Sequence, residues 1–221
     1  MKRFLWVLIA LLLFWIALGN FIFRSYRLGE SLDQARQKLI LIASYGALSI
    51  DAAQLLAVPL EPSGDRVEAY QGVCEKLEAI KQANPSLKYA YIMMTTATPG
   101  ILQYVVDADP ALQVITSKSP RALPGDKYDA RNFPEMLKAY TEPAADKTIN
   151  SDEWGVSISG YAPIHDPSGK AIAILGVDTD AAGLLKLQKS TRISGQLAVA
   201  SFFVFLVSLF GVFITRSPGT A

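Results

Sequence analysis

A predicted β-hairpin over residues 152–181 gathers hydroxyl, phenol and carboxylate groups on one of its two faces. Its sequence is DEWGVSISGYAPIHDPSGKAIAILGVDTDA, in which two strand-forming runs flank a turn at Pro167 and Ser168. Because side chains alternate along a strand, every second residue lies on the same face. Pairing outward from the turn sets Tyr161 opposite Ile174, Ser159 opposite Gly176 and Ser157 opposite Asp178.

The mixed chemistry of this face favours a small-molecule site. The face combines two hydroxyls, a phenol, a glycine and a carboxylate, and it has none of the lysine and glutamate of an ordinary solvated surface. Ligand sites have apolar walls with a few placed polar groups. An ordinary solvated face is the alternative. The opposite face is uniformly apolar and is predicted to pack against helices; it carries Val156, Ile158, Gly160, Ala173, Leu175 and Val177.

A second hairpin is predicted from residues 88–96 and 101–109, with Pro99 and Gly100 in a type II turn. Pairing from that turn sets Met93 opposite Val106 and Thr95 opposite Tyr104. One side of this hairpin then carries Tyr89, Tyr91, Met93 and Tyr104. Aromatic rings beside a carboxylate such as Asp178 suit a cation or an amino group, whereas core packing is the alternative role of each tyrosine.

Helices precede and separate the two hairpins. A helical pattern runs from Leu28 to Leu56 and ends before Pro59 and Pro62. Its seam follows heptad-like steps through Leu28, Leu32, Ala35, Leu39, Ile42, Gly46, Ser49, Ala53 and Leu56. This seam predicts a core-facing stripe, a parallel dimer contact, or both along different lengths. A second helix is predicted over residues 64–84, and a short one over 134–140 with Asn132 as its cap.

Two uncharged apolar blocks frame the chain. Residues 4–23 and residues 193–214 are each long enough to cross a bilayer as a helix. The alternatives are a cleaved signal peptide for the first block and a buried core helix for the second. Basic residues on short flanks favour the inner side, so Lys2, Arg3 and Arg216 predict that residues 24–192 lie outside and 215–221 form a short inner tail. Arg24 and Arg27 oppose this orientation.

The hairpin region resembles a known sensor family. Three stretches within residues 88–182 are similar to the extracytoplasmic Cache (PDC-type, PAS-like) sensor domains of bacterial receptors. They are the run PGDKYDARNFPEMLKAY, the triplet ADK and the spaced pattern SGYAPI, D, G, LGVD. The resemblance implies an α+β fold, with about five antiparallel strands behind a long N-terminal helix. It also implies a pocket on one sheet face, roofed by the loop between the second and third strands.

The resemblance implies a role for particular residues. An aspartate at the end of the last strand, here Asp178, holds the amino group in amine-binding relatives, and Trp154 and Tyr161 lie on the pocket strand. The sequence lacks the Tyr-x-x-x-x-Arg-x-Trp run of the full amine motif. The expected ligand is a carboxylate, an amino acid or an amine. The predicted ligand-binding residues are Tyr91, Met93, Tyr104, Trp154, Ser157, Ser159, Tyr161 and Asp178.

The sequence therefore predicts a two-pass sensor of the bacterial cytoplasmic membrane, with a periplasmic or extracellular domain. We expect a homodimer that signals to a cytoplasmic output module or partner. No catalytic motif, metal cluster or cofactor loop is present, and a net charge of +1 argues against a nucleic-acid partner. A single cysteine, Cys74, allows no internal disulfide. The alternative is a ligand-free interaction module that dimerises or recruits a partner through its long helix.

Overall fold

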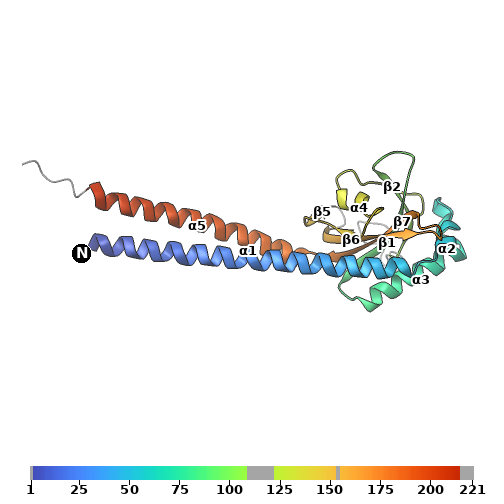
Figure 1. Ribbon diagram of the computed structural model, residues 1–221, viewed down its shortest axis with the longest axis horizontal. Helices are drawn as coiled ribbons and strands as arrows, with labels where there is room; N and C mark the ends of the chain where they lie inside the picture. The colour runs from blue at the N-terminus through green and yellow to red at the C-terminus, as the bar shows by residue number, and fades with distance from the viewer. Residues whose placement is uncertain (1, 109–121, 153–154, 215–221) are drawn as a thin grey trace, which may run out of the picture. The chain divides into compact units, whose positions relative to one another are not determined.

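The chain folds into two compact units that are described separately. The computed structural model describes residues 2–108, 122–152 and 155–214. The paired-helix unit consists of Met1–Leu32 and Gly183–Ala221, and the sheet unit consists of Asp33–Ala182. Helix α1 (Lys2–Leu48) begins in the first unit and ends in the second, and helix α5 (Ala182–Ile214) follows the last strand directly (Figure 1).

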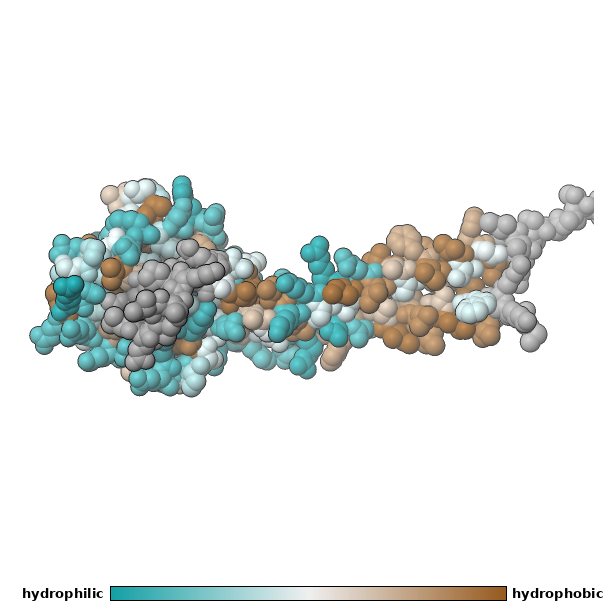
Figure 2. Space-filling model, turned by 180° about the vertical axis from the view of Figure 1, so that it is seen from behind, coloured by the Kyte–Doolittle hydropathy of each residue, from teal (hydrophilic) through white to brown (hydrophobic). Residues whose placement is uncertain are grey.

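The paired-helix unit exposes apolar side chains along its length. Two helical stretches, Phe4–Leu48 and Ala182–Val212, are long and apolar enough to cross a membrane. Only 11% and 6% of their most apolar windows are buried, so neither is the core helix of a soluble domain. Figure 2 shows this surface as a brown band, in contrast to the mostly teal sheet unit. A signal sequence meets the same criteria, so the first span remains a prediction.

The sheet unit is built on an antiparallel sheet, as predicted. Along the sheet the strands follow the order β3-β2-β1-β7-β6-β4, and β5 also pairs with β6. The strands are β1 (Leu87–Thr95), β2 (Ile101–Asp107), β3 (Lys127–Asp129), β4 (Ala144–Ala145), β5 (Asn150–Asp152), β6 (Gly155–His165) and β7 (Ala171–Asp180). The long strands β2, β1, β7 and β6 form the centre. The described residues thus contain more strands than the five or so predicted, because the flanking ones are only two or three residues long.

The uniformly apolar face of the sheet packs against helices, which confirms the prediction for that face. Helix α1 lies so close to β6 that a methyl group on Gly160 would come within 2.5 Å of Leu39 Cβ. Further along the same helix, a methyl on Gly46 would overlap Leu175 of β7 and Ile80 of α3 (Glu68–Ala83). The side chains of Ile158, Ala173, Leu175 and Val177 are fully buried there. Small residues thus let the helix backbone approach the sheet directly.

The helices end at places that differ from the predicted boundaries. Helix α1 stops at Leu48, and a separate short helix α2 (Ala52–Leu56) begins after Asp51, whose carboxylate accepts the Gln54 N–H at 2.7 Å. This N-cap interrupts the predicted continuous helix before the prolines are reached. A 3-10 turn, η1 (Pro62–Arg66), precedes α3. Helix α4 (Pro134–Lys138) forms where predicted, but its N-cap is Phe133, and Asn132 does not cap it.

Both hairpins are shifted from the predicted register. In β6 and β7, Tyr161 faces Gly176, Ser159 faces Asp178 and Ser157 faces Asp180. The turn closes between Asp166 and Lys170 around Gly169, whose φ is 84°, and a bulge follows at Ile164 and His165. These two features add two residues in total. A shift of two keeps every side chain on its predicted face while changing its partner.

The hairpin of β1 and β2 differs for a related reason. Its loop is four residues long, because Thr96 N–H bonds to the Ile101 carbonyl, and so Met93 pairs with Tyr104. A bulge after Ile92 then moves the register by one, which brings Asp107 opposite Tyr91. The predicted pairs Met93–Val106 and Thr95–Tyr104 are therefore wrong. The predicted sharing of one face by the tyrosines and Met93 is correct.

Candidate functional site

The face of the sheet opposite α1 carries the candidate site, and we call it the tyrosine face. Strand pairing places side chains from three central strands next to each other on it: Tyr89, Tyr91 and Met93 from β1, Gly176 and Asp178 from β7, and Ser159 and Tyr161 from β6. Residues of α4 and its flanks cover part of this face through Met136 and Ala139. The face is therefore a half-covered surface rather than an open one.

Tyr91 and Asp178 form a polar pair at the end of β7. The Tyr91 hydroxyl donates to Asp178 Oδ1 at 3.1 Å. Tyr91 reaches across the sheet because its cross-strand partner is Gly176, and a methyl group on Gly176 would lie 2.3 Å from the Tyr91 ring. The space that the glycine leaves is thus filled by the ring. Asp178 itself is half-buried at the end of β7.

A second carboxylate, Asp146, lies at the other side of the tyrosine face, just after β4. It is only 3% exposed, and its two oxygens accept three hydrogen bonds. The Tyr161 hydroxyl donates to Oδ1 at 3.1 Å, while Ser159 N–H and Asn150 Nδ2 donate to Oδ2 at 3.0 and 2.7 Å. In return, the Asp146 N–H donates to the Ser159 carbonyl. The carboxylate therefore fixes the Tyr161 phenol and the edge strand together.

The main chain around Asp146 also contacts helix α1. Arg36 Nε donates to the Asp146 carbonyl oxygen at 2.9 Å, and the second guanidinium nitrogen bonds to the Lys147 carbonyl. Arg36 is oriented by Asp33, one turn earlier, at 2.8 Å. The Lys147 ammonium in turn pairs with Glu135 of α4 at 2.9 Å. One short segment thus links the tyrosine face to α1 and α4.

Aromatic rings continue from Tyr91 toward the β2 edge of the sheet. Tyr91 meets Tyr104 edge to face with ring centroids 5.9 Å apart, and Tyr104 meets Tyr128 in the same way at 6.2 Å. Tyr128 then contacts Phe133 at 5.6 Å. Such edge-to-face pairs are favourable because the positive ring edge meets the negative ring face. The series forms one apolar wall of the tyrosine face, with phenol groups at intervals.

Burial controls the acid–base behaviour of the site. Burial raises the pKa of the Tyr91 and Tyr161 phenols well above the ordinary value of 10.0, and the carboxylates of Asp178 and Asp146 raise them further. Both phenols are therefore neutral hydrogen-bond donors at physiological pH. Burial also raises the pKa of Asp146 to about 6, although its hydrogen bonds from Tyr161 and Ser159 act in the opposite direction.

The predicted site residues have different environments. Met93 is fully buried and Tyr161 is 1% exposed, so both serve the core beneath the face. Ser159, at 4% exposure, contributes its main chain to Asp146. Tyr104, Ser157 and Asp178 are half-buried and line the accessible part. Trp154 lies outside the described residues, and so do residues 109–121, which are the first part of the loop predicted to roof the site. The loop was expected to be irregular as far as Asp129, but it contains the short strand β3 at Lys127–Asp129.

Sequence reasoning missed several residues of this face. Asp146 follows a strand of two residues, which is too short to give a periodic pattern. Asp107 reaches the face only because of the bulge in β1–β2 pairing, and its carboxylate accepts the Ala122 N–H at 3.1 Å. The Tyr140 hydroxyl donates to the Met93 carbonyl at 3.1 Å, after α4 has folded over the sheet. The one usable signal was an acidic residue within an otherwise apolar segment, which Asp107 gives and Asp146 does not.

The arrangement suits binding better than catalysis. Within the described ranges no group of three or more His, Cys, Asp and Glu side chains is placed to hold a metal ion. His165 is exposed at the end of β6, at the opposite end of the hairpin from Asp178. Tyr91, Tyr161 and Asp146 are buried and already hydrogen-bonded. What the half-buried part of the face offers is the Asp178 carboxylate, the Ser157 hydroxyl and the Tyr104 ring. These groups can accept hydrogen bonds from, or stabilise, a positively charged or donor-rich small molecule.

Comparisons with known proteins found similar solved structures at low sequence identity. No protein-family model and no curated protein matches the sequence. The chain is similar to the sensory domain of the Campylobacter jejuni chemoreceptor Tlp3 with isoleucine bound, at 15% identity and a TM-score of 0.47, over 80% of this chain and 65% of that one. It is also similar to the Tlp3 ligand-binding domain in complex with 4-methylisoleucine, at 15% identity and a TM-score of 0.48.

A third similar structure is the extracellular domain of the histidine kinase soHK1S-Z6, at 16% identity and a TM-score of 0.34, over 76% of this chain and 66% of that one. The similarity to the Tlp3 domain with 4-methylisoleucine covers 79% of this chain and 63% of that one, so this chain spans less than two thirds of its length.

Proposed function

We propose that this chain is a membrane-anchored extracytoplasmic sensor that binds a small organic molecule on the tyrosine face and passes a signal across the membrane. The observation that carries the proposal is the half-buried Asp178 carboxylate, which is bonded by the Tyr91 phenol and flanked by an aromatic wall. Apolar walls with few polar groups are typical of ligand sites. Two exposed apolar helical stretches, one near the N-terminus and one that follows the last strand in the sequence, support the membrane anchoring.

The ligand class that fits best carries a cationic or amino group. Asp178 can hold such a group through a charge-assisted hydrogen bond, and the phenols of Tyr91 and Tyr161 stay neutral at physiological pH. The electron-rich faces of the tyrosine rings also attract cations. An amine or an amino acid satisfies these contacts more completely than a simple carboxylate, which Asp178 would repel.

A ligand screen on the sheet unit tests the proposal. The fragment 28–190 contains the whole of Asp33–Ala182, the unit with its own core. Its melting temperature is measured with amines, amino acids and carboxylates. A ligand at a hundredfold excess over its dissociation constant stabilises the native state by about 2.7 kcal/mol. We expect upward shifts with amines or amino acids, and a broad screen without any shift would count against ligand sensing.

The Asp178→Asn variant identifies the site. Loss of a charge-assisted contact of about 1.5–3 kcal/mol should reduce affinity for a cationic ligand roughly ten- to hundredfold while the fold is retained. Asp166→Asn is the matched control, because Asp166 lies in the exposed turn at the other end of the same hairpin. Unchanged affinity in Asp178→Asn would remove this residue from the site. Tighter binding would indicate an anionic ligand instead.

One observation favours the alternative of an interaction module. The side chains of Leu41, Tyr45 and Leu48 on α1 are 55%, 71% and 81% exposed and follow each other at helical spacing. They lie beside a groove of about 540 Å³ between α1 and α3. If this stripe recruits a partner or a second copy, Tyr45→Lys should change the mass of the assembly in light scattering. A ligand response that survives this variant would keep sensing and association separate.

A further inference from the structure

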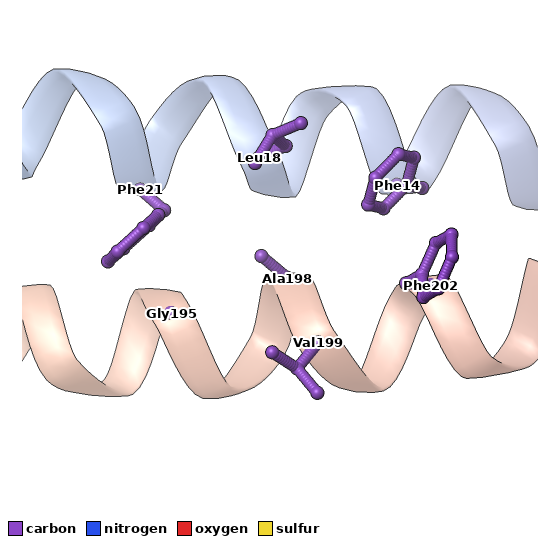
Figure 3. A pocket seen from close by; sticks show the side chains of 7 residues that line it. All are labelled: Phe14, Leu18, Phe21, Gly195, Ala198, Val199 and Phe202. Carbon is purple, nitrogen blue, oxygen red and sulfur yellow. The ribbon is translucent and has the colours of Figure 1, made fainter.

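A groove runs between the two helices of the paired-helix unit. It has a volume of about 460 Å³, and all its lining side chains are apolar: Phe14, Leu18 and Phe21 of α1, with Gly195, Ala198, Val199 and Phe202 of α5. Figure 3 shows the rings of Phe14 and Phe202 at one end, with centroids 5.2 Å apart, and Phe21 opposite Gly195 at the other. The volume falls in the range of about 300–1,000 Å³ that is usual for ligand sites.

The end of the groove at Phe21 and Gly195 leads into a polar cluster. Arg24, one turn beyond Phe21, donates from Nε to Asn20 Oδ1 at 2.9 Å and from Nη1 to Ser190 Oγ at 3.0 Å. Ser194 Oγ also donates to Asn20 Oδ1, at 3.2 Å. These partners are neutral, and within the described part of the chain no carboxylate pairs with Arg24. A guanidinium has five N–H donors, so it retains capacity for an anion.

Positive charge gathers around this end of the groove. Arg24 directly follows the first apolar block, and Arg192 directly precedes the second. The segments 24–30 and 186–192 contain five cations, the other three being Arg27, Lys186 and Lys189, against one carboxylate, that of Glu30. At the end of a membrane-spanning stretch, such residues lie at the level of the lipid headgroups, where a cationic side chain attracts an anionic headgroup; at an anionic membrane surface this attraction is about 1 kcal/mol for each Lys or Arg.

We propose that the groove binds one anionic phospholipid, with an acyl chain along the apolar lining and the phosphate on the Arg24 guanidinium. The occupant is a lipid because an apolar lining next to a guanidinium suits a molecule that joins an apolar tail to an anion. The bilayer around two exposed apolar helices supplies such molecules at high local concentration. Asn20 and Ser190 orient the guanidinium, and the neighbouring cations favour a headgroup with net negative charge.

The test uses the full chain in nanodiscs made from equal amounts of phosphatidylglycerol and phosphatidylcholine. After transfer to detergent, native mass spectrometry counts the lipids that stay bound to each protein. We expect one retained phosphatidylglycerol. Arg24→Gln should reduce its retention about fivefold, the equivalent of the ~1 kcal/mol attraction. Arg27→Gln removes the same charge one turn away, and it should have a smaller effect.

A second pair of variants probes the apolar part. Val199→Phe fills the groove and should reduce retention, whereas Val204→Phe adds the same bulk outside it and should not. In the unmodified chain, a phosphatidylglycerol with a photoreactive acyl chain should label peptides that contain Phe14 to Phe21. Equal retention of both lipids, equal loss in Arg24→Gln and Arg27→Gln, or labelling outside the lining residues would each overturn the proposal. The labelling result is decisive even if a variant fails to fold.

Discussion

Replacing Asp146 by asparagine should stabilise the sheet unit at neutral pH. The buried carboxylate has a pKa of about 6 in the folded chain, against an ordinary value of 3.8, because burial penalises its charged form. Asparagine has the same shape and no charge. Its oxygen can accept the bonds from Ser159 and Asn150, while its amide nitrogen can donate to the Tyr161 hydroxyl oxygen. The variant thus keeps the bonds from Ser159 and Asn150, reverses the bond with Tyr161, and removes the cost of burying a charge.

The sign and size follow from proton linkage. Between pH 3.8 and about 6 the folded state holds a proton on Asp146 that the unfolded state has lost. The contribution of this group to stability is therefore complete below pH 3.8 and is lost as the pH rises through 6. A pKa difference of about two units corresponds to roughly 3 kcal/mol. Asp146→Asn should match the unmodified fragment near pH 4 and exceed its free energy of unfolding by up to about 3 kcal/mol at pH 7.5.

Urea unfolding of fragment 28–190 and its variant, measured from pH 4 to pH 8, checks this expectation. The difference between the two proteins is the useful quantity, because exposed carboxylates such as Asp129, whose pKa is lowered to about 2 by Arg131, titrate equally in both. Asp146→Ala should be destabilised at every pH, since three donors lose their acceptor. If Asp146→Asn is less stable than the parent at pH 7.5, the hydrogen bonds outweigh burial and the reasoning is refuted.

Two further predictions concern the contacts of α1. Gly160→Ala should destabilise the fragment by about 2 kcal/mol or more in thermal melts, because the new methyl would lie 2.5 Å from Leu39 Cβ and 2.7 Å from the Leu39 carbonyl carbon. Gly183→Ala is the control: the space around Gly183 is open, so this variant should be neutral or slightly stabilising. Arg36→Gln should lose the bonds to two main-chain carbonyls and lower the free energy of unfolding by about 1–3 kcal/mol. Amide hydrogen exchange should then increase around Asp146, and unchanged exchange would contradict a local role for Arg36.

The sequence pattern was sufficient to predict which face each strand residue occupies, but not which residues pair. Alternation depends only on the period of two, so Ser159, Tyr161 and Asp178 were placed on one face correctly. Pairing depends on loop length and bulges. The residue types at the bulge, Ile164 and His165, do not distinguish it from an ordinary strand end. The N-cap at Asp51 was visible as a residue type, yet the seam through Ala53 and Leu56 favoured an unbroken helix.

The site itself was predicted in part, for similar reasons. The pairing of Tyr91 with Asp178 follows from two long strands whose faces were correct. Asp146 joins them through a two-residue strand, and tertiary contacts alone position it. Gly176 of β7 belongs to the mixed face that predicted a ligand site, and its missing side chain leaves a gap on that face. In the folded chain the Tyr91 ring occupies that space, because a large side chain on the neighbouring strand fills a gap more readily than solvent does.

The way in which Arg36 is bonded has a consequence for how such a domain can diversify. Its guanidinium contacts the carbonyl oxygens of residues 146 and 147, and these atoms are present whichever side chains stand there. The attachment of the edge segment to α1 is therefore independent of which side chains residues 146 and 147 carry. A substitution at position 147 can change the surface of this segment while its backbone stays bonded to the same helix.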